Sequence, residues 1–290
     1  MEENKKMYDI VIDTDAFNEV DDQFAIAYSI FSSESVSIKA FYAAPFVNEH
    51  AATAESGMEQ SYDEILHIID LCKKSGSYEV KKGAEKFLEA VEIPAHTEAT
   101  DDLINRAKNY SKEDPLYVVA IGAPTNIASA LILCPEIASK IVVLWLGGHI
   151  PEREDTKEYN LEQDLISSRT LLGSDVPLVL FPCEGVIDKL KISPKELKKR
   201  LGHGALSDYL IHIVEQYEFK EFGDEKVIWD VVPFSWLIVE NCVQLKEDKV
   251  KGISDDCRWI DLKDSKRYHY AKDINPEIIF DDLFQKIANK

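Results

Sequence analysis

Five carboxylic acids lie within ten residues near the start of the chain: Asp13, Asp15, Glu19, Asp21 and Asp22. They follow an apolar run at residues 8–12 and precede a segment at residues 23–31 whose apolar side chains recur at helical spacing. Carboxylates this close repel one another, and burying them without a partner costs free energy. Because a hard divalent cation relieves that repulsion, the stretch predicts half of a Ca²⁺ or Mg²⁺ site.

The alternative is that these acids serve the helix that follows them. An Asp at the start of a helix is a common N-cap and complements the helix dipole, which would account for Asp21 or Asp22. It does not account for Asp13 and Asp15 as well, since one helix needs one cap. Ligands of open α/β sheets bind where a strand's carboxyl end meets a helix, so we favour a functional site.

The elements that must position these acids alternate along the chain. Strand-like apolar runs recur at residues 8–12, 36–43, 116–121, 141–146 and 177–181. Helical patterns lie between them, at residues 48–74, after Thr125 and at residues 161–172. This rhythm predicts the α/β class: an open, mostly parallel, Rossmann-like sheet with helices on both faces, in a single domain over residues 1–290.

Weaker patterns occupy the second half of the chain. The charged stretch at residues 189–200 predicts a solvated helix, with Ser193 as the cap and Pro194 in the first turn. Residues 255–272 predict an edge hairpin, and a closing helix is expected from Pro276.

Charge and composition exclude several classes of partner. The formal net charge is −20, so nucleic-acid backbones and anionic membranes would be repelled at long range. The five cysteines are scattered and form no CxxC pair, which fits reduced thiols in the cytosol. The first residues lack the apolar core of a signal peptide, and no apolar stretch is long enough to span a membrane, so we expect a cytoplasmic protein.

Two later strand ends carry polar residues with two open readings each. At residues 120–127, Thr125 or Asn126 either caps a helix or lies on the same rim as the acidic stretch. At residues 158–160, Glu158 and Asn160 could bind hydroxyl groups, although Asn160 could equally be an N-cap. Near residue 230 an apolar helical stretch begins with a single acid, Asp230, which is either a cap or a buried ligand.

Taken in order, these elements resemble the inosine–uridine nucleoside hydrolase family. The resemblance rests on Asp-Thr-Asp…Asp-Asp after the first strand, Pro-Thr-Asn-Ile midway, Gly-Gly followed by Glu-Tyr-Asn, and a late Trp-Asp. It runs from about residue 8 to residue 238. It implies a Ca²⁺-dependent enzyme that hydrolyses the N-glycosidic bond of a small-molecule ribonucleoside, releasing ribose and free base. It also implies a homodimer or homotetramer.

The resemblance assigns roles position by position. Asp15 matches the general base, which also binds the metal, and Asp13 matches a residue that orients the loop. Asp22, Asp230 and the backbone carbonyl of Thr125 match the other calcium ligands. The ribose-binding positions match Asp21, Glu158 and Asn160, and Asn48, which matches an Asn after the second strand, is also expected to bind substrate.

The chain also departs from the family pattern around the base. The loop between Asp15 and Asp21 is two residues longer and carries Asn18 and Glu19, and Trp229 replaces the His that protonates or orients the departing base in many members. Trp229 could stack on a nucleobase or belong to the core. Glu19 could bind an amino or cationic substituent or face solvent. We therefore expect a non-standard or modified nucleoside as substrate.

Two other functions compete with this one. A haloacid-dehalogenase-type phosphohydrolase also places Asp-x-Asp after its first strand, but its Lys and later acidic pair have no convincing match here, and the negative charge disfavours phosphorylated substrates. A catalytically weak or inactive nucleoside- or ribose-binding protein would keep the sugar site. Asp15 argues against it, because a pure binder needs no general base.

Overall fold

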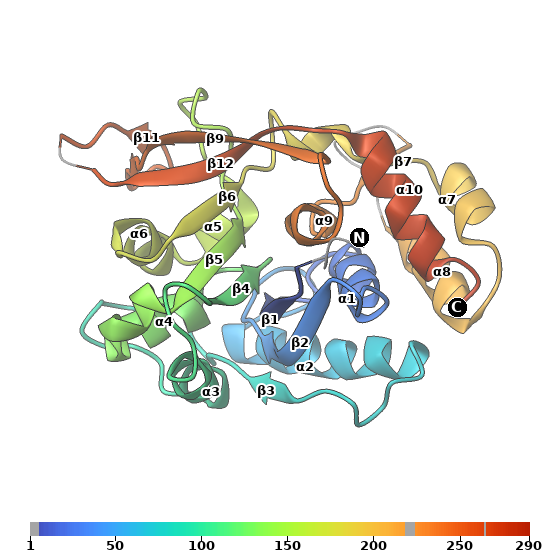
Figure 1. Cartoon of the computed structure of the whole chain (residues 1–290), viewed down its shortest axis with the longest axis horizontal. Coiled ribbons are helices and arrows are strands. Elements are labelled where there is room, and N and C mark those ends of the chain that lie inside the picture. Colours follow the sequence, from blue (N-terminus) through green and yellow to red (C-terminus); the bar gives the residue numbers. More distant parts are fainter. Residues whose placement is uncertain (1–5, 218–223, 264) are drawn as a thin grey trace.

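The computed structural model describes residues 6–217, 224–263 and 265–290. An eight-stranded sheet with the order β3-β2-β1-β4-β5-β6-β12-β9 crosses this part of the chain (Figure 1). All neighbouring strands in it are parallel except β12 and β9. The strands are β1 (Tyr8–Thr14), β2 (Val36–Ala43), β3 (Val80–Lys82), β4 (Leu116–Ala120), β5 (Ile141–Leu146), β6 (Leu178–Phe181), β9 (Val243–Lys249) and β12 (Arg267–Ile274).

The strand order reverses direction at β1. The chain proceeds from β1 to β2 and β3 on one side, and returns to β4, β5 and β6 on the other. Asp13 in β1 is in register with Tyr42 of β2 and Ala120 of β4, so these three strands end at the same edge. A crevice at the carboxyl ends of the strands is expected at such a switch point.

Helices cover both faces of the sheet and create two apolar cores. Along β1 the side chains alternate: Ile10 and Ile12 belong to one core and Val11 to the other. The first core receives α1 (Asp22–Ile30), α2 (Ala54–Leu71), α7 (Pro194–Leu201), α8 (Ala205–Gln216), α9 (Val231–Ile238) and α10 (Pro276–Ile287). The second receives α3 (Glu98–Ala107), α4 (Thr125–Leu133) and α6 (Leu165–Gly173).

Short elements complete the described chain. The helix α5 (Tyr159–Gln163) directly precedes α6, and η1 (Pro135–Ser139) and η2 (Ile187–Lys189) are single 3-10 turns. Two small antiparallel pairs lie outside the main sheet: β7 (Lys191–Ile192) with β8 (Lys226–Val227), and β10 (Gly252–Ile253) with β11 (Trp259–Ile260). None of the described helices is long and apolar enough to cross a lipid bilayer.

The predicted fold class is confirmed, and several element boundaries are corrected. The predicted helix at residues 48–74 begins at Ala54, because Thr53 caps it and Ser56 closes a capping box. The predicted helix at residues 161–172 is broken at Asp164, whose side chain caps α6. In the charged stretch only Pro194–Leu201 is helical, capped by Ser193 as predicted.

One further prediction is wrong, and one of two open readings is excluded. The last long strand is not part of an edge hairpin at residues 255–272: β12 inserts between β6 and β9, so β9 is the edge strand. Thr125 and Asn126 do not cap α4 either, because the N-cap residue is Pro124 and makes no side-chain cap bond. Both polar side chains are used by other partners at the carboxyl edge of the sheet.

Candidate active site

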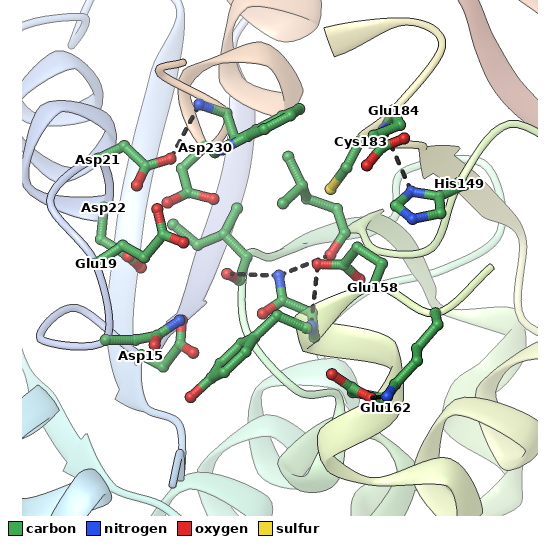
Figure 2. Close-up of a pocket in the computed structure, with 17 residues that line it drawn as sticks. Asp15, Glu19, Asp21, Asp22, His149, Glu158, Glu162, Cys183, Glu184 and Asp230 are labelled. Atoms are coloured by element: carbon green, nitrogen blue, oxygen red, sulfur yellow. Dashed lines mark hydrogen bonds and ion pairs between the residues drawn. The ribbon is translucent and has the colours of Figure 1, made fainter. Parts of the chain in front are cut away.

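A cavity of about 310 Å³ lies at the carboxyl edge of the sheet, between the segments that follow β1, β5 and β6 and the start of α9 (Figure 2). Its size is within the range of small-molecule sites. Eight of the ten site residues predicted from the sequence line it: Asp15, Glu19, Asp21, Asp22, Glu158, Asn160, Trp229 and Asp230.

Three of these acids form a tight buried cluster. One oxygen from each of Asp21, Asp22 and Asp230 lies within 4.8 Å of the others. Asp21 and Asp230 occupy the N-cap positions of α1 and α9, yet neither side chain makes a capping hydrogen bond. The helix-capping alternative therefore does not account for them, although both helix N-termini favour negative charge here.

Asp15 is the acid with an open oxygen. Its side chain is 1% exposed and lines the cavity, and its Oδ2 has no hydrogen-bond partner among the described residues. A Cβ atom at Gly122 would lie 3.0 Å from Asp15 Oδ1, so a glycine there lets the carboxylate rest against the end of β4. Burial and then the charge of Asp22 hold the pKa of Asp15 well above its usual range.

The neighbouring acids are fixed by hydrogen bonds. Thr14 donates its hydroxyl proton to Asp22, and burial, followed by the charge of Asp21, raises the pKa of Asp22 to about 7. Asp13 accepts a bond from the Asn126 amide at 2.8 Å, and burial raises its pKa to about 7. Asp13 is not among the residues that line the cavity, which agrees with an orienting role.

Lys226 is a buried charged residue beside the site that the sequence did not reveal. Its side chain is 4% exposed, and its Nζ lies 2.6 Å from Glu19 Oε2 and 3.3 Å from Asp21 Oδ1. It also donates to the Val227 carbonyl at 2.9 Å. Burial acts to lower the pKa of Lys226, but the Asp21 and Glu19 carboxylates outweigh it and keep the pKa above its usual range. The local sequence gives no signal, because both acidic partners are about 200 residues away.

Trp229 supplies a second contact to the same loop. Its backbone N–H donates to Asp21 Oδ2 at 2.9 Å, so Asp21 is held on both oxygens. The Trp229 side chain lines the cavity beside Asp230. The segment before α9 thus fixes the acidic loop as well as supplying Asp230.

The Glu158 side chain is hydrogen-bonded to backbone N–H groups. Its carboxylate accepts hydrogen bonds from the N–H groups of Gly148, Asn160 and Leu161, at 2.7, 3.0 and 3.1 Å. Glu158 rather than Asn160 is therefore the N-cap of α5. Burial raises the pKa of Glu158 to about 7, and these N–H donors oppose the shift.

The other three polar residues at this edge bridge strand ends or neighbouring loops. The Asn160 side-chain amide donates to the carbonyls of Ile121 and Leu146, each at 3.1 Å. Thr125 Oγ1 donates to Asp164 at 2.8 Å. Asn48 donates to Asn18 of the acidic loop at 3.0 Å. Thr125 and Asn48 are the two predicted site residues that do not line the cavity.

The far end of the cavity contains titratable groups that the sequence did not single out. Figure 2 shows His149, Cys183 and Glu184 across the cavity from the acidic cluster, with Glu162 below them. The backbone N–H of Glu184 donates to His149 Nδ1 at 3.4 Å, and burial lowers the pKa of His149. His149 follows β5 and Cys183 follows β6, so the rule that ligands bind at strand carboxyl ends could have found both.

The donor set fits a hard divalent cation. Asp21, Asp22 and Asp230 bring three carboxylate oxygens together in one buried place, and Asp15, whose Oδ2 has no described hydrogen-bond partner, lines the same cavity. Burial raises the pKa values of Asp15, Asp22 and Asp230, and the charge of neighbouring carboxylates raises each of them further, so a cation would relieve this repulsion.

Comparisons with known proteins identify the family and the fold of the chain. A family model described as inosine-uridine preferring nucleoside hydrolase matches residues 10–277. The fold is similar to a plant nucleoside hydrolase, with 16% identity, a TM-score of 0.76, and 98% of this chain and 99% of that chain covered. A purine-preferring ribonucleoside hydrolase from Gardnerella vaginalis gives 20% identity, a TM-score of 0.73 and coverages of 97% and 98%.

A third solved structure, an inosine-uridine preferring nucleoside hydrolase from Bacillus anthracis, gives 16% identity, a TM-score of 0.71 and coverages of 97% and 99%. No curated protein matches the chain. Because these structures are all nucleoside hydrolases, they give no support to the haloacid dehalogenase alternative. The resemblance inferred from the sequence is confirmed, and the chain belongs to the inosine–uridine preferring nucleoside hydrolase family.

Proposed function

We propose that this ribonucleoside hydrolase uses Ca²⁺ and acts on a non-standard or modified ribonucleoside, releasing ribose and free base. Family membership supports the reaction class. The observation that carries the rest is the open oxygen of Asp15 beside the cluster of Asp21, Asp22 and Asp230. A buried carboxylate with no partner fits both a cation ligand and a base poised over a substrate.

In this proposal the cation is held by carboxylates and one backbone carbonyl. Asp15, Asp22, Asp230 and the carbonyl of Thr125 would hold it, an oxygen set of the kind that Ca²⁺ accepts. The bound ion supplies positive charge that lowers the pKa of an attacking water. Asp15 removes the proton from that water as the water oxygen bonds to the anomeric carbon.

The remaining residues position the sugar and stabilise the developing charge. Asp21, Glu158 and Asn160, which line the cavity, are proposed to bind the ribose, and Asn48 is proposed to assist substrate binding through its hydrogen bonds to Asn18 of the acidic loop. As the bond from the anomeric carbon to the base nitrogen breaks, positive charge grows on the ribose, as in other glycoside hydrolyses. Nearby carboxylates favour that charge, because they are fixed in place before the reaction.

The proposed substrate is non-standard because the surroundings of the base differ from the family pattern. Trp229 stands where many members have His, and Glu19 comes from the loop that is two residues longer. Both side chains line the cavity. We propose that Trp229 contacts the base and that Glu19 binds a donor group on it.

The family resemblance supports several further proposals. We propose that residues 1–290 act as one nucleoside-hydrolase domain, that the protein assembles as a homodimer or homotetramer, and that it works in nucleoside salvage in the cytoplasm. The expected partner is a small molecule, with no nucleic acid and no membrane, in keeping with the net charge of −20.

The direct test is release of reducing sugar from a panel of common and modified ribonucleosides, with Ca²⁺ or with a chelator. Asp15→Asn should bind nucleoside yet lose turnover by about 10²–10⁴-fold, the usual contribution of a positioned general base. Chelator-sensitive release that needs Asp15 would support the proposal. Tight nucleoside binding with no release from any substrate would favour the binding-protein alternative.

A further inference from the structure

We propose that the preferred substrates are ribosides whose base carries a fixed positive charge, such as N7-alkylated purine ribosides or N-ribosylpyridinium compounds. This inference rests on the proposed function and names the substrate class of the same cavity. It follows from the charges that line the cavity, from the aromatic side chain beside them, and from the way a cationic base departs.

The cavity lining is strongly acidic. Eight carboxyl groups line it, against one lysine and one histidine: Asp15, Glu19, Asp21, Asp22, Glu158, Glu162, Glu184 and Asp230, with Lys157 and His149. With every carboxyl group ionised, a divalent cation, Lys157, Lys226 and the Arg153 that pairs with Glu184 would offset about five of the eight negative charges, so the cavity keeps a net negative charge. Charges of one sign that line a low-dielectric cleft focus the field and favour ligands of the opposite sign.

Lys226 does not make the part of the cavity around Glu19 and Asp21 positively charged. Its ammonium group is shared between Glu19 and Asp21, so two carboxylates surround one cation. The trio keeps a net negative charge and presents Glu19 to the cavity. Glu19 is 34% exposed and lines the cavity while Lys226 holds its Oε2 at 2.6 Å. A solvent-facing role for Glu19 is therefore not what the contacts indicate.

An aromatic side chain adjoins this charge. Trp229 lines the cavity next to Asp230, and its backbone is bonded to Asp21. The face of an indole attracts cations, most strongly where water is excluded. A flat cationic base placed against Trp229 would combine stacking with the field of the carboxylates.

The leaving step also suits a cationic base. When a neutral base departs, the electron pair of the broken C–N bond stays on its nitrogen, and the base must gain a proton. When the base is cationic, the same electron pair neutralises it, and the proton lost by water goes to Asp15. No proton donor to the base is required.

The donors near the acidic end are engaged elsewhere. Lys226 is bonded to Glu19, Asp21 and the Val227 carbonyl. The Tyr159 hydroxyl, which also lines the cavity, donates to the Val47 carbonyl at 3.0 Å. A substrate that needs no protonation makes no demand on either group.

The experiment compares substrates that differ in one charge. We would measure kcat/KM for 7-methylguanosine and guanosine in the presence of Ca²⁺, each divided by its uncatalysed hydrolysis rate, with N-ribosylnicotinamide as a second cation. Binding of the same compounds to the Asp15→Asn variant gives a readout independent of turnover. We expect the cationic ribosides to be favoured about tenfold or more in both measurements, as for charges several ångströms apart at intermediate dielectric.

Two charge-matched variants locate the source of the preference. Glu19→Gln should reduce it several-fold, whereas Glu184→Gln, which removes the same charge at the far end of the cavity, should change it less. If Glu19→Gln left the preference for cationic ribosides unchanged, the electrostatic origin of that preference would be rejected. Equal or better use of guanosine by the wild type would overturn the inference while the proposed function stands. No hydrolysis of any riboside would reject the proposed function, and this inference with it.

Discussion

Asp15 and Glu158 are two fully buried carboxylic acids that line the same cavity, and their surroundings differ in kind. Glu158 accepts three backbone N–H bonds and caps a helix. Asp15 has Oδ2 without a described hydrogen-bond partner and lies close enough to Asp22 and Asp21 for their charges to act on it. Burial raises both pKa values, but N–H donors oppose the shift at Glu158, whereas the charge of Asp22 adds to it at Asp15.

This difference separates a carboxylate that the backbone holds in place from one that its own protein leaves without a partner. The three N–H donors fix Glu158, and a remaining lone pair can still accept a hydrogen bond from a ribose hydroxyl. A carboxylate that its own protein leaves repelled is destabilising until a cation or substrate arrives. Asp15 and the cluster of Asp21, Asp22 and Asp230 follow the second pattern, although the buried ammonium group of Lys226 offsets part of their negative charge.

The largest expected effect on stability comes from removing that ammonium group. Lys226→Met would leave Glu19 and the buried Asp21 without their cation, so the free energy of unfolding should fall by about 3–5 kcal/mol. Urea denaturation at pH 8 measures the loss, and Lys226→Arg should recover part of it.

The matched control lies at the far end of the cavity. Lys157 is 63% exposed and pairs with Glu162 at 3.4 Å, so Lys157→Met should change the free energy of unfolding by only about 0–1 kcal/mol. Equal losses for the two variants would contradict the contrast between the two ends.

The next largest effect is expected when the charges of Asp15 and Glu158 are removed, because the free energy of unfolding should then change in opposite directions. With a chelator present at pH 8, Asp15→Asn should raise the free energy of unfolding, because a neutral amide replaces an acid whose ionised form is disfavoured by burial and by the charge of Asp22. Glu158→Gln should lower it by about 1–3 kcal/mol, because charge-assisted bonds to backbone N–H groups are weakened. Urea denaturation of both variants measures the two changes. If the free energy of unfolding changed in the same direction in both variants, the distinction between Asp15 and Glu158 would be refuted.

The sequence predicted the elements that carry local patterns. The strands at residues 36–43 and 141–146 have the predicted limits, because continuous apolar runs are typical of strands covered on both faces. The acidic loop was recognisable because five acids between a strand and a helix exceed what one cap requires.

The predictions that failed concern residues whose contacts are made by partners distant in sequence. Residues 255–272 predicted an edge hairpin, but β12 pairs with β6 and β9, a choice made by tertiary packing. Lys226 could not be found as a site residue, because its charge has meaning only beside Glu19 and Asp21. The choice between capping and binding was open for Asn160, and the N-cap proved to be Glu158, for which the sequence had suggested only hydroxyl binding.

The smallest expected effect is a pH dependence of stabilisation by Ca²⁺. The pKa of Asp22 is raised from 3.8 to about 7, so its contribution to stability without metal is fully present below pH 3.8 and is lost as the pH rises through about 7. Since cation binding needs the deprotonated carboxylates, Ca²⁺ should raise Tm by several degrees at pH 8 and much less at pH 5. Asp22→Asn should abolish the gain and Glu158→Gln should keep it, as thermal unfolding with Ca²⁺ and with a chelator would measure. If Glu158→Gln removed the gain as fully as Asp22→Asn does, both ends of the cavity would take part in cation binding, and the contrast between Asp15 and Glu158 would describe burial alone.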